Sequence, residues 1–439
     1  MKKLLAVVMS VVIAAAVMCP VLTASAAGDT DYTIVNPYET VDWDSWQYYK
    51  ANLHTHSVAS DGDETITDMV GLYYDAGYDI LALTDHGVVS HGWNLPRKTN
   101  GVFNYFRKAD PMSDEDYQRI TTGSDRGGRG MTDITGGIEI NMAVFSKTHV
   151  NGYFTEYGQG EWGIETAPAK VEEMGGYSVL NHVGDWVNSN RYPERSHWDV
   201  FITYFANIFK DYHTCLGMEI KNNTDNVTRA DRALWDELLQ VVIPTGRNIW
   251  AFADDDSEYR NEVGRSFEYF VLPENTEEAV KTGMINGTFF ACSRYEKHIQ
   301  AGVDDFEGNG NVPLVKNIIV DQQANTIELV LDESRDCSLI EWVADGKVIS
   351  NDLKIDLNDF ESKLGCYVRF KLQGEGGVTY SQPFELKYEN RVDKDIPTRY
   401  WFFDTFAGEL FLSIYRTRAF TIMLFLIEKI GCKIFGSRF

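Results

Sequence analysis

The chain has 439 residues, of which 44% are hydrophobic and 13% aromatic, and its formal net charge at pH 7 is −25. So many apolar side chains exclude a disordered chain and can fill the cores of two or three domains. The acidic balance argues against nucleic acid as a general partner, because binding to a phosphate backbone needs basic patches.

The N-terminal segment has the three parts of a secretory signal peptide. Two lysines precede a long apolar run, which ends at the small residues Ala24, Ser25 and Ala26. We therefore predict that residues 1–26 are a signal peptide and that the mature protein is secreted or lies at the cell surface. A segment that is not cleaved and anchors the chain in a membrane is the alternative.

Strand-like and helical patterns alternate between residues 46 and 300. The segment ETITDMVGLYYDAGY predicts a helix that begins after Thr65 or Thr67 and ends near Gly77. Buried-strand patterns that end in polar residues occupy residues 79–87, 133–141, 175–183, 214–222 and 248–256. Repeated strand–helix units predict a parallel sheet or barrel, with the chemistry at the C-terminal ends of the strands.

Residues 88–133 interrupt this alternation with a stretch rich in glycine, charged and aromatic residues. We interpret the stretch as a loop or cap over the site, because mobile length inserted at a strand end is how such folds vary specificity. A surface excursion without a function is the alternative.

Residues 312–390 change to short alternating strands separated by turn residues, which predicts a small antiparallel β-sandwich. Trp342, Tyr367 and Tyr380 are either core residues, which is the more common role, or an aromatic surface for carbohydrate.

The cysteines are scattered and have neither a CxxC pair nor the spacing of a disulfide framework. Cys337 and Cys366 lie in the region of the predicted β-sandwich and are the candidates for a disulfide. Because an odd number of cysteines remains once the signal peptide is removed, at least one cysteine should be free.

Residues 396–439 form a hydrophobic tail of helical character that carries six basic and three acidic residues. Its longest mostly apolar stretch, residues 419–427, is far shorter than the roughly 20 residues of a membrane-spanning helix. One interpretation is an amphipathic helix pair in peripheral contact with an anionic membrane. The other is packing on the protein's own surface or on a second subunit.

His54 and His56 lie two residues apart in the strand-like segment NLHTH, so their side chains point to the same side of the strand. Asp61 follows in a Ser-Asp-Gly turn, and His86 ends the next predicted strand, one helix later. Neighbouring parallel strands would bring these side chains to one end of a sheet. Asp85, which precedes His86, is the candidate for orienting a ligand from behind.

Further predicted strand ends carry the same kinds of side chain. A single histidine in such a place is usually an ordinary structural residue, but the repetition predicts a metal site. The additional candidates are Glu139, His149, His182, Asp254, Asp255, Asp256 and Glu258.

The motifs LHTHSVASDG and LALTDHG resemble the signature of the polymerase and histidinol phosphatase (PHP) family, and the resemblance covers about residues 48–300. It implies a distorted (β/α)7 barrel with two or three divalent ions (Mn, Zn or Fe) at the strand ends. The implied ligands of the first ion are His54, His56 and Asp256, with Glu139 as its bridge to the second.

The resemblance also assigns the other positions. His149 and His182 look like ligands of the second ion, and Asp61 and His86 like ligands of the third. The family usually has Asp-x-His where this chain has Asp256, Ser257 and Glu258, so Glu258 stands in place of a histidine. A glutamate is a harder, anionic ligand, which implies a weaker or different third ion. An offset register, with Asp254 or Asp255 as the ligand, stays open.

The activity implied is hydrolysis of a phosphate ester of a small substrate, monoester or diester, by a metal-activated water. The catalytic set so implied is His54, His56, Glu139, His182 and Asp256. Two alternatives are an amidohydrolase-like enzyme with the same metals and a non-catalytic surface-binding module on an inactive barrel.

Other polar residues receive lesser roles. We expect Glu219 to be a structural hydrogen-bonding residue rather than a ligand. The candidates for contact with a phosphate group are Arg265, Lys147 and Arg191. His91, just after His86, is a candidate for contact with substrate, whereas His197, His213 and His298 lie outside the motifs.

Overall fold

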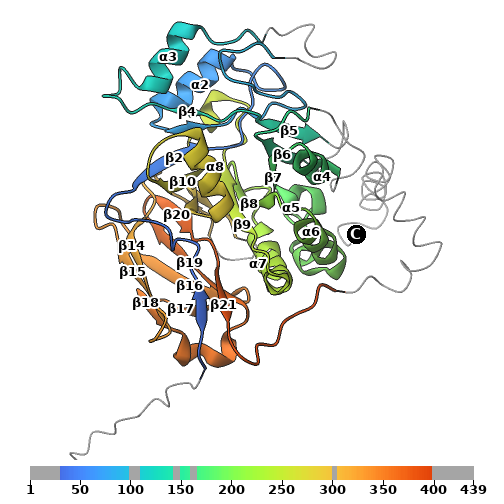
Figure 1. The fold of residues 1–439 in the computed structure, drawn as a ribbon, viewed down its shortest axis with the longest axis vertical. Coiled ribbons are helices and arrows are strands. Elements are labelled where there is room, and N and C mark those ends of the chain that lie inside the picture. Colours follow the sequence, from blue (N-terminus) through green and yellow to red (C-terminus); the bar gives the residue numbers. More distant parts are fainter. Residues whose placement is uncertain (1–29, 98–108, 142–148, 159–165, 299–303, 398–439) are drawn as a thin grey trace, which may run out of the picture.

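The computed structural model describes residues 30–97, 109–141, 149–158, 166–298 and 304–397. These residues form a mixed α/β fold (Figure 1). The predicted signal peptide, Lys147 and nearly all of the hydrophobic tail lie outside the described residues.

The first part of the predicted alternation is confirmed. Strands β2 (Gln47–Asn52), β3 (Ile80–Leu81) and β4 (Thr132–Asp133) pair in parallel. Helix α2 (Ile66–Asp75) joins β2 to β3, and the Thr65 hydroxyl accepts a hydrogen bond from the Asp68 amide at its start. Thr65 is therefore the N-cap, and the alternative cap Thr67 lies inside the helix.

A second sheet has the strand order β5 (Ile138–Asn141), β6 (His149–Tyr153), β7 (Tyr177–Leu180), β8 (Cys215–Asn222) and β9 (Trp250–Asp254). Strands β7, β8 and β9 pair in parallel, whereas β6 is antiparallel to both of its neighbours. Helices on the outer side of this sheet are α4 (Thr166–Glu173), α5 (Val183–Val187), α6 (Asp199–Asp211) and α7 (Asp231–Val242) (Figure 1). Short 3-10 turns at Pro193–His197 (η2) and Ile243–Thr245 (η3) follow α5 and α7.

Two isolated parallel bridges connect the ends of the two sheets. One joins Thr55 to Ser257 and the other joins His86 to Glu139. They bring four of the polar segments predicted from the sequence to one end of the fold. The full (β/α)7 barrel is not confirmed, because the antiparallel strand β6 breaks the regular parallel order.

The predicted insertion is only partly a loop. Its helix α3 (Asp114–Thr122) begins after Ser113, whose hydroxyl accepts a hydrogen bond from the Asp116 amide. Trp93 and Ile120 from this stretch are fully buried in the same core cluster as α2. Within the described residues, the insertion is therefore a packed part of the fold.

The predicted β-sandwich is not confirmed as a separate unit. Strand β20 (Gly377–Tyr380) pairs with β11 (Phe289–Ser293), which pairs with β10 (Ser266–Leu272), and β10 pairs with β2. An eleven-stranded sheet thus runs from the first strands into the C-terminal region. Besides these four strands and β3 and β4, its members are β1 (Thr33–Val35), β16 (Leu339–Ala344), β17 (Lys347–Ser350), β19 (Tyr367–Gly374) and β21 (Phe384–Lys387).

The smaller elements complete the C-terminal half. A three-stranded sheet contains β14 (Val315–Asp321), β15 (Thr326–Leu331) and β18 (Lys354–Asp356), and the pair β12 (Tyr295–Glu296) and β13 (Phe306–Glu307) lies apart from it. The other helical segments are α8 (Glu277–Asn286), η4 (Arg260–Glu262) and η5 (Leu357–Lys363).

The aromatic residues of the C-terminal region are core residues. Trp342, Tyr367 and Tyr380 are all buried, so they offer no aromatic surface to carbohydrate. The predicted disulfide is wrong, since Cys337 and Cys366 are both free. The Cys366 thiol is buried against the carbonyl group of Leu239, 3.5 Å away, in the other half of the molecule.

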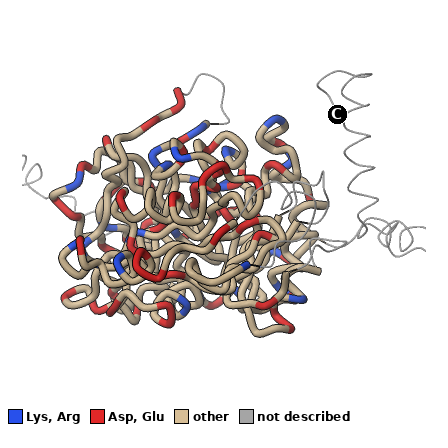
Figure 2. Tube along the Cα trace, turned by 90° about the horizontal axis from the view of Figure 1, so that it is seen from above, with Lys and Arg blue, Asp and Glu red and all other residues tan. Residues whose placement is uncertain are grey.

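In the Cα trace of Figure 2, acidic and basic residues are intermixed along the described chain. Among the helices that the structure describes, none combines the length and the apolar character required to cross a membrane.

A buried ionic network connects the C-terminal half to β8. Lys221 Nζ on β8 lies 2.7 Å from Asp225 and also contacts Glu296. Tyr380 and Lys371, both from the C-terminal strands, reach the same Glu296 carboxylate at 2.8 and 3.4 Å. A buried charge is costly unless it is paired, so these contacts hold the two halves in one arrangement.

Replacing Glu296 by Ala should destabilise the protein by about 3–5 kcal/mol, because Lys221 would lose one of its buried partners. Urea unfolding monitored by circular dichroism measures the change. Glu328→Ala is the matched control, since Glu328 forms an exposed pair with Lys354 at 3.5 Å, and such pairs contribute about 0–1 kcal/mol. Equal losses for the two variants would contradict the role of the network.

Candidate metal centre

The carboxylate of Glu139 lies at the centre of the predicted site. Glu139 is the second residue of β5 and only 1% exposed. Its Oε1 atom lies 3.2 Å from His54 Nε2, 3.0 Å from His149 Nδ1 and 3.3 Å from His182 Nε2. Three imidazoles thus converge on one oxygen, one from the start of β6 and two from just beyond the ends of β2 and β7.

The other oxygen of Glu139 faces two further histidines. Oε2 lies 2.9 Å from His86 Nδ1 and 3.3 Å from His56 Nε2. A single buried carboxylate therefore touches all five histidines that the motif assigns to the metal site.

Gly137, two residues before Glu139, allows its segment to approach the segment of His86. A Cβ atom at Gly137 would lie 2.6 Å from the carbonyl oxygen of Leu83. The Glu139 amide donates to the Thr84 carbonyl at 3.0 Å, and its own carbonyl accepts from Gly87 at 2.9 Å. A side chain at position 137 would push these strands apart and remove Glu139 from His86.

Asp256 is the aspartate of the DDD run that contacts the histidines. Its Oδ1 atom lies 3.1 Å from His54 Nε2 and 3.0 Å from His56 Nε2. Asp254 instead accepts from the Leu53 amide, and Asp255 accepts from three amides of residues 264–266. The structure thus favours the first of the two registers left open by the sequence.

Asp61 forms the outer part of the cluster. Its Oδ2 atom lies 3.2 Å from His86 Nε2, and its Oδ1 atom lies 3.6 Å from His56 Nδ1. Burial raises the pKa of Glu258, and the negative charge of the nearby Asp61 raises it further. Among the described residues, however, Glu258 joins no group of three or more ligand atoms within 4.8 Å of one another.

Three overlapping groups of ligand atoms have the spacing that a metal ion needs, with all atoms of each group within 4.8 Å of one another. The groups are His54, His56, Glu139 and Asp256; His56, Asp61 and His86; and His86, Glu139 and His149. Because they share residues, they mark adjacent positions for two or three ions. The mixed imidazole and carboxylate set suits Mn, Fe or Zn.

The polar atoms of the cluster fit a cation better than they fit one another. His54 Nε2 and His56 Nε2 lie only 3.2 Å apart, although at most one of two facing imidazole nitrogens can donate to the other. Within the described part of the chain, Glu139 Oε2, His86 Nδ1 and His182 Nδ1 are buried and make no hydrogen bond of good geometry. Buried polar atoms without such bonds are rare unless an ion or water completes them.

Glu219 orients two ligands from behind, as expected of a hydrogen-bonding residue. His54 Nδ1 donates to Glu219 Oε1 at 2.6 Å, which makes Nε2, the nitrogen that faces Glu139 and Asp256, the one available to an ion. The backbone amide of His182 donates to Glu219 Oε2 at 2.7 Å. A carboxylate behind a metal-binding imidazole fixes its tautomer and raises its basicity.

The backbone is strained at two of the predicted ligands. His182 has φ 27° and Asp256 has φ 48°, both in the left-handed region that costs a non-glycine residue free energy. Such strain persists at sites where the side chain must be aimed in one direction.

The carboxylates and the histidines shift one another's protonation. Burial works against a charged His86 or His182, but nearby carboxylates outweigh it. Glu139 and Asp61 raise the pKa of His86 to about 10. Glu139 and Asp256 raise the pKa of His182 to about 9. In turn, the imidazoles of His149, His86 and His54 hold the pKa of Glu139 well below its ordinary value despite burial. His149 is the exception, because burial outweighs Glu139 and lowers its pKa.

Sequence reasoning missed two asparagines at the site. Asn181 Nδ2 donates to Glu139 Oε1 at 2.8 Å, and Asn222 Nδ2 donates to Asp256 Oδ2 at 3.2 Å. Each is a polar residue at or beside the C-terminal end of a strand, β7 or β8, which is the signal that located the histidines.

The structure places the other candidates outside the cluster. Arg265 contacts Asn223 and Glu262, and Arg191 lies over the ring of Tyr192, 5.4 Å from its centroid. Among the histidines outside the motif, His91 is paired with Glu156 at 3.5 Å and His197 with Glu237 at 2.8 Å.

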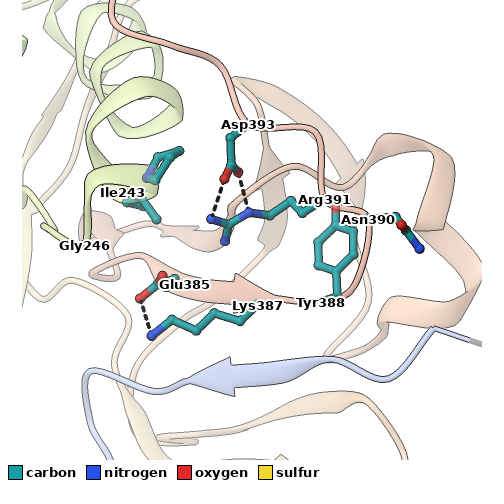
Figure 3. Close-up of a pocket in the computed structure, with 9 residues that line it drawn as sticks. Ile243, Gly246, Glu385, Lys387, Tyr388, Asn390, Arg391 and Asp393 are labelled. Carbon is teal, nitrogen blue, oxygen red and sulfur yellow. Dashed lines mark hydrogen bonds and ion pairs between the residues drawn. The ribbon is translucent and has the colours of Figure 1, made fainter.

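A surface pocket near β21 and η3 is separate from the metal centre. Its charged lining residues pair with each other, Arg391 with Asp393 and Lys387 with Glu385 (Figure 3). It contains none of the predicted site residues.

No family model and no curated protein matches the chain. A two-domain protein from Bacteroides vulgatus containing a predicted PHP-like metal-dependent phosphoesterase is similar in structure, with a TM-score of 0.40 and 15% identity over 80% of this chain and 89% of that one. The lesion-specific endonuclease PfuEndoQ from Pyrococcus furiosus has a TM-score of 0.33 and 13% identity, over 54% of this chain and 56% of that one. An amidohydrolase from Chromobacterium violaceum has a TM-score of 0.28 and 13% identity, over 48% and 87%. Likenesses this weak carry no argument about activity.

Replacing Glu139 by Gln should remove at least one bound Mn²⁺ per chain, because Glu139 belongs to two of the three ligand groups. Elemental analysis after equilibrium dialysis measures the stoichiometry. Glu156→Gln is the control, since that exposed carboxylate pairs with His91 and belongs to none of the three ligand groups found among the described residues. Unchanged stoichiometry in a folded Glu139→Gln protein would contradict Glu139 as a ligand.

The apparent affinity for Mn²⁺ should rise with pH across the range from 7 to 9. An ion must displace protons from His86 and His182, whose pKa values are raised to about 10 and about 9, and fewer protons remain to be displaced at higher pH. Calorimetry in buffers of different ionisation enthalpy counts the protons released. Binding without proton release at pH 7 would show that these imidazoles are neutral or do not bind metal.

Proposed function

We propose that this chain is a metal-dependent hydrolase of the PHP type, which cleaves a phosphate ester of a small substrate. The observation that carries the proposal is the contact of five histidines with the single buried carboxylate of Glu139, with Asp61 and Asp256 at its margins. Two or three bound Mn, Zn or Fe ions would supply a nucleophilic hydroxide near neutral pH and the positive charge that stabilises phosphoryl oxygens.

Different side chains would hold different ions of the site. Glu139 is placed to bridge two positions, since both of its oxygens face histidines from different strands. His54 and His56 would hold one ion together with Asp256, and His149 and His182, which both face Glu139 Oε1, would hold another. Asn181 donates to Glu139, which fixes the plane of the carboxylate.

A water nucleophile is favoured over a protein thiol. Burial raises the pKa of Cys215, Cys292 and Cys366 to about 12, so these thiols are protonated at neutral pH. A protonated thiol is a poor nucleophile. None of the four described cysteines belongs to the ligand groups.

The charge of the loaded site suits a phosphate group. Three divalent ions carry +6, and the carboxylates of Asp61, Glu139, Asp256 and Glu258 carry −4, which leaves about +2 by simple counting. A local positive charge on an acidic protein would attract a small anionic substrate.

We further propose that the protein is secreted or held at the cell surface and that its tail contacts a membrane peripherally.

The test is hydrolysis of a chromogenic phosphate monoester and a diester by the Mn²⁺-loaded protein. Asp256→Asn should lower turnover by at least about 100-fold, because even residues behind the ligands contribute roughly 10–100-fold. Asp359→Asn, far along the sequence in η5, is the matched control and should keep full activity.

The substrate panel separates the alternatives. Turnover of an amide or lactone, without turnover of either phosphate ester, would replace the proposal by an amidohydrolase-like activity. Stoichiometric metal binding without turnover of any of these substrates would count against a phosphoesterase and support a binding module.

A further inference from the structure

A fully buried arginine lies behind the metal centre. The side chain of Arg97, from the stretch inserted after His86, is 0% exposed. Its Nη1 atom lies 3.0 Å from Asp85 Oδ2, and its Nη2 atom donates to Ser90 Oγ at 2.8 Å. A guanidinium group stays charged in proteins, so Arg97 and Asp85 form a buried ion pair.

Asp85 connects this arginine to the turn that follows β2. Its Oδ1 atom accepts from the Ser57 amide at 2.7 Å and from Ser60 Oγ at 2.9 Å. Its Oδ2 atom accepts from Ser57 Oγ at 2.8 Å, on the same oxygen that faces Arg97. The carboxylate therefore has a partner on every side, and its position fixes the turn.

The turn carries two of the candidate ligands. Ser60 Oγ lies 3.3 Å from His56 Nδ1 and 3.1 Å from Asp61 Oδ1. A Cβ atom at Gly62 would lie 2.8 Å from the backbone of His56, so the turn packs directly against the strand end. Because Ser60 contacts Asp85, His56 and Asp61, a shift of Asp85 would also move these two candidate ligands.

The second arm of Arg97 donates to Ser90, whose backbone pairs with the segment that leads into Glu139. Ser90, its partner, donates its amide to the Gly137 carbonyl at 2.9 Å and accepts from the Gly136 amide at 2.7 Å. One guanidinium thus holds Asp85 and Ser90, which lie on either side of His86 in the chain, and Ser90 in turn pairs with the segment that leads into Glu139. The planar fork of arginine can hold two such partners at once, which the single ammonium of lysine cannot do with the same geometry.

We propose that Arg97 is a positioning residue for the metal position that Asp61 shares with His86. It acts through Asp85 and Ser60 and touches no ligand itself. The stretch inserted after His86 would then be part of the metal centre's support. The inference rests on the metal-binding part of the proposed function and not on the bond that is cleaved.

The test compares Co²⁺ binding to the full chain and to Arg97→Lys, followed by the visible absorption of Co²⁺ and by elemental analysis. Asp61→Asn defines the ion in question, since it removes one carboxylate of that position only. Arg97→Lys should lower the affinity for the same ion by about 10–100-fold, as changes behind metal ligands do. The other ions should bind as in the unaltered chain.

Arg129→Lys is the matched control. Arg129 comes from the same inserted stretch and forms a bidentate pair with the buried Asp79 at 2.6 and 2.7 Å, away from the ligand groups. Arg129→Lys should lower the thermal stability without changing the affinity for any of the ions. If Arg129→Lys weakened binding of the ion at the Asp61 position as much as Arg97→Lys does, the cause would be a general loss of stability. That result would overturn the proposal.

A double variant keeps the test valid if Arg97→Lys folds poorly. Arg97→Gln with Asp85→Asn leaves no unpaired buried charge, so the fold should persist. The affinity for the ion at the Asp61 position should nevertheless stay low. Binding of that ion at full strength in either variant would overturn the proposal, as would an unchanged ion count in Asp61→Asn. Intact positioning of metal with no hydrolysis of phosphate esters would instead overturn the proposed activity alone.

Discussion

Burial of the Glu139 carboxylate among five imidazoles is the constraint on which the rest of the site depends. A buried carboxylate is costly unless opposite charge and hydrogen bonds surround it. In the protein without ions, protons on His86 and His182 meet that need, which is why Glu139 raises their pKa values. Metal ions would meet it by replacing those protons, so metal binding and proton release belong to one equilibrium.

The fold supplies this convergence by joining the ends of two sheets. The bridges Thr55–Ser257 and His86–Glu139 hold strands from both sheets at the same level. Positive φ angles at His182 and Asp256 then aim those side chains inward, at a cost that the surrounding contacts must offset. Glu219 shares in this, because one carboxylate fixes both the ring of His54 and the backbone of His182.

The C-terminal half supports this arrangement as part of the same sheet. Strand β20 pairs with β11, and the buried contacts of Lys221 with Glu296 connect β8 to the C-terminal strands. Glu219 and Lys221 lie two residues apart on β8. The strand that orients His54 is therefore held both by the metal centre, through Glu219, and by the ionic network, through Lys221.

The sequence by itself determined which residue types form the site and that they lie at strand ends, because alternation, caps and motif spacing are local properties. It also determined helix α2 and the strand segments around Glu139 and His182. Only the tertiary structure decided that Asp256, rather than Asp254, faces the histidines, since this depends on one left-handed backbone angle. It likewise decided the support by Arg97 and the continuous sheet through β11 and β20, because those contacts join segments whose pairing no local pattern encodes.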